Sequence, residues 1–385
     1  MIAQPFFRVS VSKEGRRRMR ILLLTDRMEA GGAETHIELL AQGLARKGAE
    51  VSLLSSGGRM ADRLERVGIT QYRIPPTDGS LFRFLRAMKE VTDLLRAERF
   101  DLLHAHTRRT ALFLRNGRHH PPIAVTAHAH YQPLPFPLSR GDWGDATVAV
   151  SEDLRAHLCD RFSVPAERIT VIPNGIDCNR FSPPKSEPPP HSVVFASRMD
   201  DDCTRGGELL CAVLPRLCVA FPDLRITLAG GGNALDRLRR RAEICNRTVG
   251  FEAIRVIGHV SEMPSLYQGH SIAVGVSRAA MEAAACGCAV ILCGNEGYAG
   301  VLSKKVPTPA LSNFCCRGFP LPTEEALCRD LISLLENQTY RRESALSAHE
   351  WICSEFSATR MIEETVAFYN RLLRLKGASG KGDRV

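Results

Sequence analysis

A proline-rich segment at residues 182–190 divides this chain into two halves that share one pattern. The segment reads SPPKSEPPP, so five of its nine residues are proline. Proline has no backbone N–H and cannot continue a helix or a central strand. The segment is therefore interpreted as a linker between two α/β halves of similar size.

Before the linker, short apolar runs typical of buried parallel strands alternate with helical patterns. The first run, Arg20–Thr25, leads through Gly31-Gly32 into a helix expected from Ala33 to about Lys47. Strands are also expected at Val51–Leu54, Asp101–His104, Ile123–His128, Ala146–Val150 and Ile169–Ile172. This order predicts a doubly wound parallel sheet with helices on both faces.

The same alternation resumes after the linker. Strands are expected at Val193–Ser197, Arg225–Ala229, Arg255–Ile257, Ile272–Val276 and Val290–Cys293, with helices near Gly207–Ala220, Asn233–Asn246 and Ala279–Cys286. We therefore expect an α/β protein of two Rossmann-like doubly wound domains that face a cleft. Ligands of such sheets bind beyond the carboxyl ends of the strands.

These patterns give an expected division of the chain. Residues 1–18 are a basic extension expected to be disordered, 19–181 the N-terminal Rossmann-like domain, and 182–190 the linker. Residues 191–356 are the C-terminal Rossmann-like domain, 357–375 a last amphipathic helix, and 376–385 a tail. The apolar positions expected on that helix are Met361, Ile362, Val366, Phe368, Tyr369 and Leu372.

The net charge of +9 lies entirely at the two ends of the chain. Residues 1–20 carry six basic residues and one acid, and residues 371–385 carry five basic residues and one acid. The body between them is neutral, which argues against a surface for duplex nucleic acid. The basic ends are interpreted first as solvated tails, with peripheral contact to an anionic membrane as the alternative.

The 13 cysteines include no CxxC pair and no Cys/His array at zinc spacing. Several of them lie in apolar runs, where cysteine behaves as a small hydrophobic residue. An odd number of scattered cysteines suits a reducing compartment, and no apolar run approaches the ~20 residues of a membrane span. We expect a cytoplasmic protein, with the inner face of the membrane as a place for peripheral contact.

The stretch from Ala273 to Gly300 predicts a ligand site in the second half. It reads as a buried strand, a small-residue helix with one acid at Glu282, a second strand and a glycine-rich turn. A carboxylate there accepts hydrogen bonds from hydroxyl groups of a sugar-nucleotide. Loop amides at a helix start donate hydrogen bonds to phosphate. Gly31-Gly32 and Gly230-Gly231-Gly232 are similar turns between a strand and a helix. The alternative interpretations are that Glu282 is a solvated acid and that the glycines only form tight turns.

Histidines mark the ends of two expected strands in the first half. His104 and His106 end one strand, and His128 and His130 end another. Such pairs can suggest a metal, but no acid stands at ligand spacing, so we expect no metal site. One of the histidines is better interpreted as a contact to sugar or phosphate.

Taken together, GGAETHIELLAQGL, VSEDL, VIPNGIDCNRF, the turn after ITLAGGG, and EAAACGCAVI resemble glycosyltransferase family 4. The resemblance runs from about Arg20 to Leu373. It implies retaining enzymes of the GT-B fold, with the acceptor on the N-terminal domain and the nucleotide-sugar on the C-terminal domain. It also implies that the last helix crosses back to the N-terminal domain.

The resemblance implies a role for each matching residue. Gly31 and Gly32 would offer amides to the diphosphate, and His128 would contact the donor sugar. Arg198 would neutralise the diphosphate, and Glu282 would accept from the ribose hydroxyls as the second acid of the E-x7-E signature. The backbone at Gly258 and His259 would border the base.

The sequence departs from the family pattern at two positions. Val274 stands where the first acid of E-x7-E is expected, and Cys203 stands where a lysine is expected, with Arg205 nearby in another register. Glu296, in the next loop, would supply the acid that is missing at Val274. The run Asp200–Asp202 is interpreted as a solvated loop and not as metal ligands.

We therefore expect a retaining glycosyltransferase that moves a sugar from a nucleotide-sugar, a UDP- or GDP-sugar, to an acceptor hydroxyl. The acceptor class stays open between a glycan, a lipid-linked and a small-molecule acceptor, as in cell-surface polysaccharide or glycolipid synthesis. The donor is a substrate, so no resident cofactor is expected. The alternatives are a nucleotide-sugar epimerase or isomerase of the same fold, and a non-catalytic sugar-nucleotide-binding protein.

Overall fold

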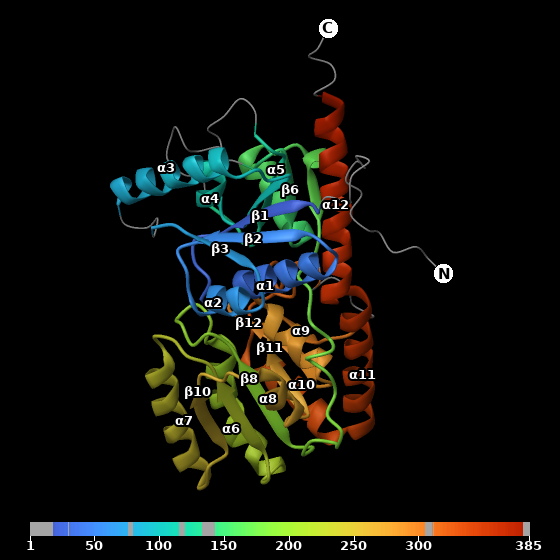
Figure 1. Cartoon of the computed structure of the whole chain (residues 1–385). Coiled ribbons are helices and arrows are strands. Elements are labelled where there is room, and N and C mark those ends of the chain that lie inside the picture. The colour runs from blue at the N-terminus through green and yellow to red at the C-terminus, as the bar shows by residue number, and fades with distance from the viewer. Residues whose placement is uncertain are drawn as a thin grey trace. The chain divides into compact units, whose positions relative to one another are not determined.

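The computed structural model describes residues 18–29, 31–75, 80–114, 120–132, 143–304, 310 and 312–379, without the side chains of 377–379. The chain forms two compact units (Figure 1). The first runs to Gly175 and resumes at Ala358, and the second spans Ile176–Ser357. Residues 1–17 of the expected extension and 380–385 of the expected tail lie outside the described part of the chain.

Seven parallel strands form the sheet of the first unit, in the order β3-β2-β1-β4-β5-β6-β7. The chain builds outward from β1, first toward β3 and then toward β7, so the order reverses between β1 and β4. In doubly wound sheets, ligands bind beyond the carboxyl ends of the strands at this reversal. The strands are β1 (Arg20–Leu24), β2 (Glu50–Ser55), β3 (Thr70–Arg73), β4 (Leu102–Ala105), β5 (Ile123–Ala127), β6 (Ala146–Ala149) and β7 (Ile169–Val171).

Each face of this sheet has its own core, because alternate residues of a strand point to opposite faces. Ile21 and Leu23 of β1 pack with α1, α2 and α12, whereas Leu22 and Leu24 pack with α3, α4 and α5. The helices of the unit are α1 (Gly32–Arg46), α2 (Arg59–Arg66), α3 (Leu81–Ala97), α4 (Arg108–Phe113), α5 (Glu152–Phe162), the short 3₁₀-helix η1 (Ala166–Arg168) and α12 (Ala358–Ser379).

Helix α12, red in Figure 1, brings the end of the chain into the core of the first unit. All six apolar residues expected on this helix are buried there. It lies so close to α1 that a side chain on Gly43 would clash with Ile362. The Tyr369 hydroxyl also contacts Nδ1 of the buried His104 in β4. No helix among the described residues is long and apolar enough to cross a bilayer.

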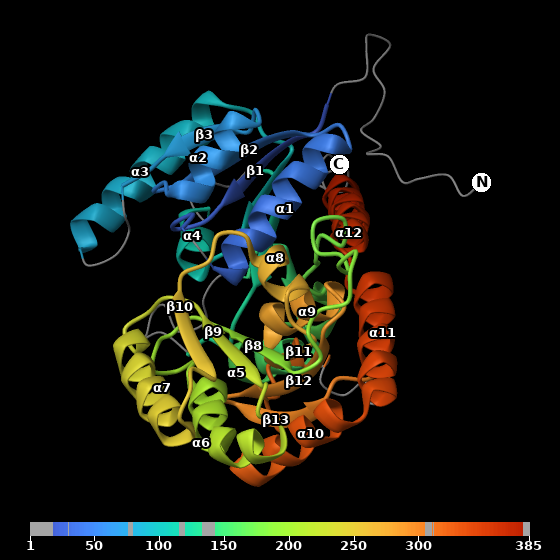
Figure 2. The same ribbon diagram turned by 90° about the horizontal axis from the view of Figure 1, so that it is seen from below.

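The second unit has a six-stranded sheet in the order β10-β9-β8-β11-β12-β13, which can be followed in Figure 2. All pairs are parallel except β12 with β13, which is antiparallel. The strand order reverses between β8 and β11. The strands are β8 (Ser192–Ala196), β9 (Arg225–Ala229), β10 (Ile254–Gly258), β11 (Ile272–Gly275), β12 (Ala289–Gly294) and β13 (Gly297–Val301).

This sheet too is covered on both faces, which makes each unit a doubly wound α/β structure, as expected. Val193 and Phe195 of β8 pack with α6, α7 and α10, while Val194 and Ala196 pack with α8, α9 and α11. The helices are α6 (Arg205–Ala220), α7 (Leu235–Val249), α8 (Met263–Gln268), α9 (Ser277–Ala285), α10 (Glu324–Glu336) and α11 (Gln338–Glu355).

The structure differs from the sequence expectations at three places. Strand β3 was not expected, because it lacks an apolar run. The expected glycine-rich turn at 294–300 is a hairpin of β12 and β13 joined by the two residues Asn295 and Glu296. Residues 176–190 belong to the second unit, although 176–181 were expected in the first half and 182–190 as the linker, and Ile176 and Phe181 are buried in the core of that unit.

The buried histidines of the first unit predict a stability that falls in mild acid. Burial lowers the pKa of His104 to about 3 and that of His106 well below its usual value. In the unfolded chain these two histidines bind a proton below a pH of about 6.5, whereas in the folded chain they stay neutral. Between that pH and the lower folded pKa, each histidine should reduce the free energy of unfolding by roughly 1.4 kcal/mol per pH unit.

Urea unfolding at pH 7.0, 6.0 and 5.0 measures this slope. His104→Gln should flatten it, whatever its effect on stability at neutral pH. A slope that is the same in wild type and in the His104 variant would contradict the assignment.

Candidate functional site

The turn that leads from β1 into α1 holds Gly31 and Gly32. The Gly31 carbonyl accepts hydrogen bonds from both the amide and the hydroxyl of Thr35, which fixes the first turn of α1. A side-chain carbon on Gly32 would meet nothing within 4 Å, so its backbone is open to approach. On Gly31 such a carbon would clash with the Glu34 carboxylate, which therefore folds back over the start of the helix. A diphosphate bound there would displace this carboxylate.

Strands β4 and β5 end in histidines that lie together at the carboxyl edge of the first sheet. His106 follows β4 and is buried, and His128 follows β5 and is half-buried. Nδ1 of His106 lies 3.1 Å from Nε2 of His128. His128 is the residue expected to touch the donor sugar. Its neighbour His106 is a neutral imidazole, because burial lowers the pKa of His106 well below its usual value.

A third imidazole, from His36 in α1, completes this group and was missed by the sequence analysis. Its ring centroid lies 4.9 Å from that of His128 and 5.6 Å from that of His106. Its Nδ1–H donates to the Asn174 side-chain oxygen at 3.0 Å. His36 occupies a core-facing position of an amphipathic helix and is only 2% exposed. A polar residue at such a position was the available signal.

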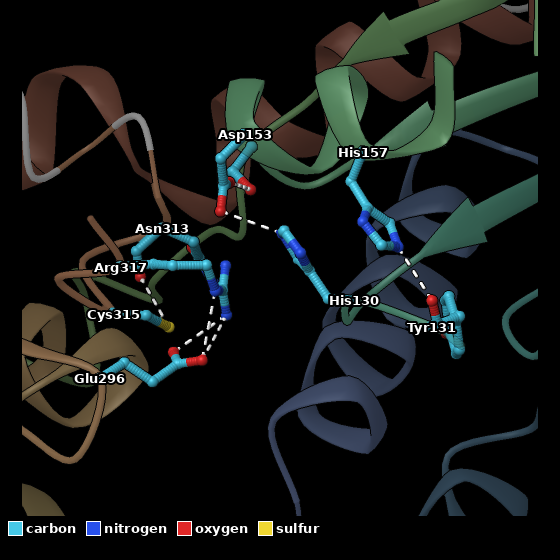
Figure 3. Close-up of polar contacts among 9 residues, drawn as sticks. His130, Tyr131, Asp153, His157, Glu296, Asn313, Cys315 and Arg317 are labelled. Atoms are coloured by element: carbon cyan, nitrogen blue, oxygen red, sulfur yellow. Dashed lines mark hydrogen bonds and ion pairs between the residues drawn. The ribbon is translucent and has the colours of Figure 1, made fainter. Parts of the chain in front are cut away.

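Other polar pairs flank the two edges, and Figure 3 shows four of the residues involved in them. In the first unit, Nε2 of His130 lies 3.1 Å from the carboxylate of Asp153 in the first turn of α5. In the second unit, Glu296 forms a two-pronged ion pair with Arg317, with Nη2 2.9 Å from each carboxylate oxygen. Arg317 was not identified from sequence. Because Glu296 sits on the two-residue turn of the β12–β13 hairpin, this pair fixes where its carboxylate points.

Arg198 lies after β8 and is an exposed cation at the carboxyl edge of the second sheet, with 65% of its side chain accessible. It approaches Asp200 at 3.7 Å and Asp202 at 3.9 Å. The three acids that follow do not converge: Asp200 accepts from the Asn233 amide, and Asp201 pairs with Arg237. The long contacts of Arg198 leave its guanidinium able to meet an incoming anion.

The glycine turn after β9 packs against the loop that carries Arg198. A side chain on Gly230 would clash with the Ser197 carbonyl, and one on Gly232 would clash with the backbone of Met199. Gly230 also has a φ of +143° and donates its N–H to the Gly258 carbonyl at 2.7 Å. Gly258 ends β10 with a φ of +74°, and His259 beyond it is exposed. These glycines therefore bring the ends of β8, β9 and β10 together.

Glu282 lies in the middle of α9 and is 9% exposed. Burial raises the pKa of its carboxyl, and Arg278, one helical turn earlier at 3.4 Å, partly opposes this shift. The alanines of α9 pack with residues of β12 in one core cluster, and Glu282 lies among them on the same helix. A buried carboxylate with a single long ion pair retains capacity to accept hydroxyl hydrogen bonds.

Val274, which stands in place of the first signature acid, is a core residue. It lies in β11 between Phe195 of β8 and Ile291 of β12 and is 2% exposed. A carboxylate at this position would be buried without water. The valine therefore fits the packing of the sheet.

Comparison with known proteins identifies the family. The model of Glycosyltransferase Family 4 matches residues 30–180, and the model of Glycosyl transferases group 1 matches residues 190–337. The two matches fall on the two sheets and together span most of the chain. The chain belongs to glycosyltransferase family 4. Each half of this transferase thus matches one family model.

Curated relatives of the transferase share about a quarter of its residues. The gpi3 subunit of phosphatidylinositol N-acetylglucosaminyltransferase from Schizosaccharomyces pombe is 24% identical, over 89% of this chain and 78% of the relative. The human relative, which is named for the same enzyme, is 25% identical, over 74% of this chain and 64% of the relative. Phosphatidyl-myo-inositol mannosyltransferase from Mycolicibacterium smegmatis is 25% identical, over 92% of this chain and 95% of the relative.

Solved structures share the fold of the transferase. A glycosyltransferase from Rickettsia africae superposes with a TM-score of 0.73 at 17% identity, over 93% of this chain and 99% of the other. An Anabaena protein crystallised in complex with UDP gives 0.70 at 18% identity, over 92% and 100%. At these identities the likeness concerns the fold.

The packing of the transferase at Gly230 gives a prediction. Gly230→Ala should lower the free energy of unfolding by about 2 kcal/mol or more, because it adds a clash with Ser197 to a strained backbone conformation. Gly231→Ala is the matched control, because a side chain there would meet only His259, at 3.9 Å. Urea unfolding of both variants measures the difference. Equal stability of the two variants would show that the turn relaxes freely.

Proposed function

We propose that this glycosyltransferase moves a sugar from a UDP- or GDP-sugar to a hydroxyl of an inositol-containing phospholipid, with retention of the anomeric configuration. The observation that carries the donor half is Glu282, a buried carboxylate in α9 that is ion-paired with Arg278. The fold is shared with a protein crystallised with UDP. The acceptor half draws on relatives that are named as phosphatidylinositol transferases.

In the proposed mechanism the second unit holds the nucleoside diphosphate. Glu282 accepts hydrogen bonds from the ribose hydroxyls, and the backbone at Gly258 and His259 borders the base. Negative charge grows on the diphosphate as the sugar departs through an oxocarbenium-like transition state. Arg198 meets this charge, which is the kind of interaction that lowers a barrier most. Since Arg198 and backbone amides supply the positive charge, the transfer step needs no divalent metal.

Loop residues supply the groups proposed to act on the sugar. His128, at the end of β5, contacts the donor sugar, and the amides at Gly31 and Gly32 serve the diphosphate once Glu34 moves aside. Glu296 replaces the acid that is missing at Val274, with its direction set by Arg317. The anomeric configuration is then retained if the acceptor hydroxyl attacks the sugar on the same face from which the diphosphate departs.

The proposal predicts that Glu282→Gln weakens binding of the nucleoside diphosphate. The loss should be roughly 1.5–3 kcal/mol, the range for hydrogen bonds to a charged group. Titration calorimetry with UDP and GDP measures it. Glu243→Gln, an exposed acid in α7 of the same unit, is the control and should bind normally. Unchanged affinity in a folded Glu282 variant would remove this residue from the site.

Glu296→Ala tests the assignment of the sugar-side acid. Transfer should fall by at least about 100-fold while affinity for the nucleoside diphosphate stays within twofold, because a contact that tightens in the transition state affects rate more than binding. Transfer by Arg317→Met should also fall, since this change releases the carboxylate. Full activity of Glu296→Ala would overturn the assignment. A wild type that binds nucleotide-sugars but never transfers them would instead indicate a binding protein.

The lipid acceptor implies that the protein works at a membrane surface, and α3 is the element that fits this task. Leu81, Phe82 and Leu85 are 73%, 75% and 47% exposed at its start. Arg83, Arg86 and Lys89 follow along the same helix and are exposed, with Arg86 and Lys89 each paired to an acid one turn further on. Exposed apolar side chains next to basic ones suit the interface of an anionic bilayer.

A vesicle experiment tests this membrane contact. The double variant Leu81→Ser, Phe82→Ser should bind vesicles containing phosphatidylinositol at least about tenfold more weakly, because burial of each large apolar side chain contributes more than about 1 kcal/mol. Val219→Ser, which removes a side chain in α6 that is 88% exposed, is the control and should bind as wild type does. Equal binding of both variants would place the membrane contact elsewhere.

A further inference from the structure

We propose that His36, His106 and His128 form a binding site for Zn²⁺ or a similar first-row transition metal at the carboxyl edge of the first sheet. Each residue offers one imidazole nitrogen, and the three nitrogens lie within 4.8 Å of one another. The three histidines come from different elements, namely the start of α1 and the ends of β4 and β5. Their spacing along the chain is not that of a metal motif, because the fold and not the chain order brings them together.

The separations suit tetrahedral coordination after a small adjustment. Zinc–nitrogen bonds of about 2.0–2.1 Å place two ligating nitrogens roughly 3.3 Å apart in a tetrahedron. His106 and His128 are already at this spacing, with 3.1 Å between Nδ1 and Nε2. Closing the remaining separations takes a side-chain rotation of His128, which is half-buried.

The surroundings of the three rings favour metal binding. His36 donates its Nδ1–H to Asn174, which leaves the lone pair on Nε2, and metal-bound histidines are oriented by partners of this kind. His106 is buried, and its Nδ1 is the ring nitrogen that faces His128. A neutral imidazole is the form that coordinates a metal.

The ligand set selects the metal. Three imidazoles without a carboxylate suit Zn²⁺, Co²⁺, Ni²⁺ and Cu²⁺, whereas Mg²⁺ and Ca²⁺ prefer oxygen. Three protein ligands also leave a fourth position open. A metal bound here engages the imidazole of His128, so it should inhibit sugar transfer. Only this last consequence rests on the proposed function.

Binding of Zn²⁺ to the full chain, stripped with EDTA and kept reduced, tests the site. We expect one Zn²⁺ per chain by titration calorimetry, with affinity at least about tenfold lower in His36→Gln and in His106→Gln. Asn174→Ala should weaken binding by about tenfold through loss of the orienting partner. His191→Gln, in the second unit, is the matched control and should bind as wild type does.

The 13 cysteines are the competing zinc ligands, and Co²⁺ separates the two kinds of site. Cobalt bound to imidazoles gives visible d–d bands without a thiolate charge-transfer band. A strong thiolate band, or equal affinity in wild type and His36→Gln, would overturn the proposal, and the spectrum of the wild type decides even if a variant fails to fold.

The inhibition is measured separately from the binding. Micromolar Zn²⁺ should reduce sugar transfer, EDTA should restore it, and Mg²⁺ should have no effect. Zinc binding at the histidines without inhibition would leave the site in place and remove His128 from the donor site.

Discussion

Parallel pairing of β1 with β4, and of β8 with β11, is the constraint on which the rest of the structure depends. In each unit these central strands run side by side and the chain then builds outward in both directions. Their carboxyl ends therefore meet at one edge of the sheet. The loops and helix starts at this edge supply polar groups that the apolar core does not accommodate. Most candidate residues lie at such an edge because the strands end there, whereas Glu282 lies within α9.

The two edges differ in their chemistry. The first unit presents three imidazoles, of which burial lowers the pKa of His106, together with a helix start covered by its own acid, Glu34. The second unit presents charged groups in pairs: Arg198 with its neighbouring acids, Glu282 with Arg278, and Glu296 with Arg317. Charged groups held by partners suit the binding of a diphosphate and ribose. Neutral imidazole nitrogens suit hydrogen bonding to a sugar or coordination of a metal.

Much of the fold could be predicted from the sequence, because parallel strands buried on both faces are continuous apolar runs. The run at Arg20–Thr25 and the six apolar positions of α12 are examples. Strand β3, TQYR, gives no such signal because it lies at the sheet edge and is only partly buried. Strand β13 is short and glycine-rich, so its antiparallel pairing with β12 could not be distinguished from a turn. A local pattern can single out His36 as a polar residue on the core face of a helix, but the contacts that His36 and Arg317 make with distant segments depend on packing that no local pattern encodes.

The central claim is that the carboxyl edge of the second sheet holds a nucleoside diphosphate. Hydrogen–deuterium exchange with and without saturating UDP or GDP measures this most directly, with binding verified by calorimetry. We predict slower exchange in residues 197–203, 229–235, 257–260 and 276–283, and little change in α6, α10 and α11 of the same unit. Nucleotide that binds tightly but leaves these four segments unprotected would contradict the account.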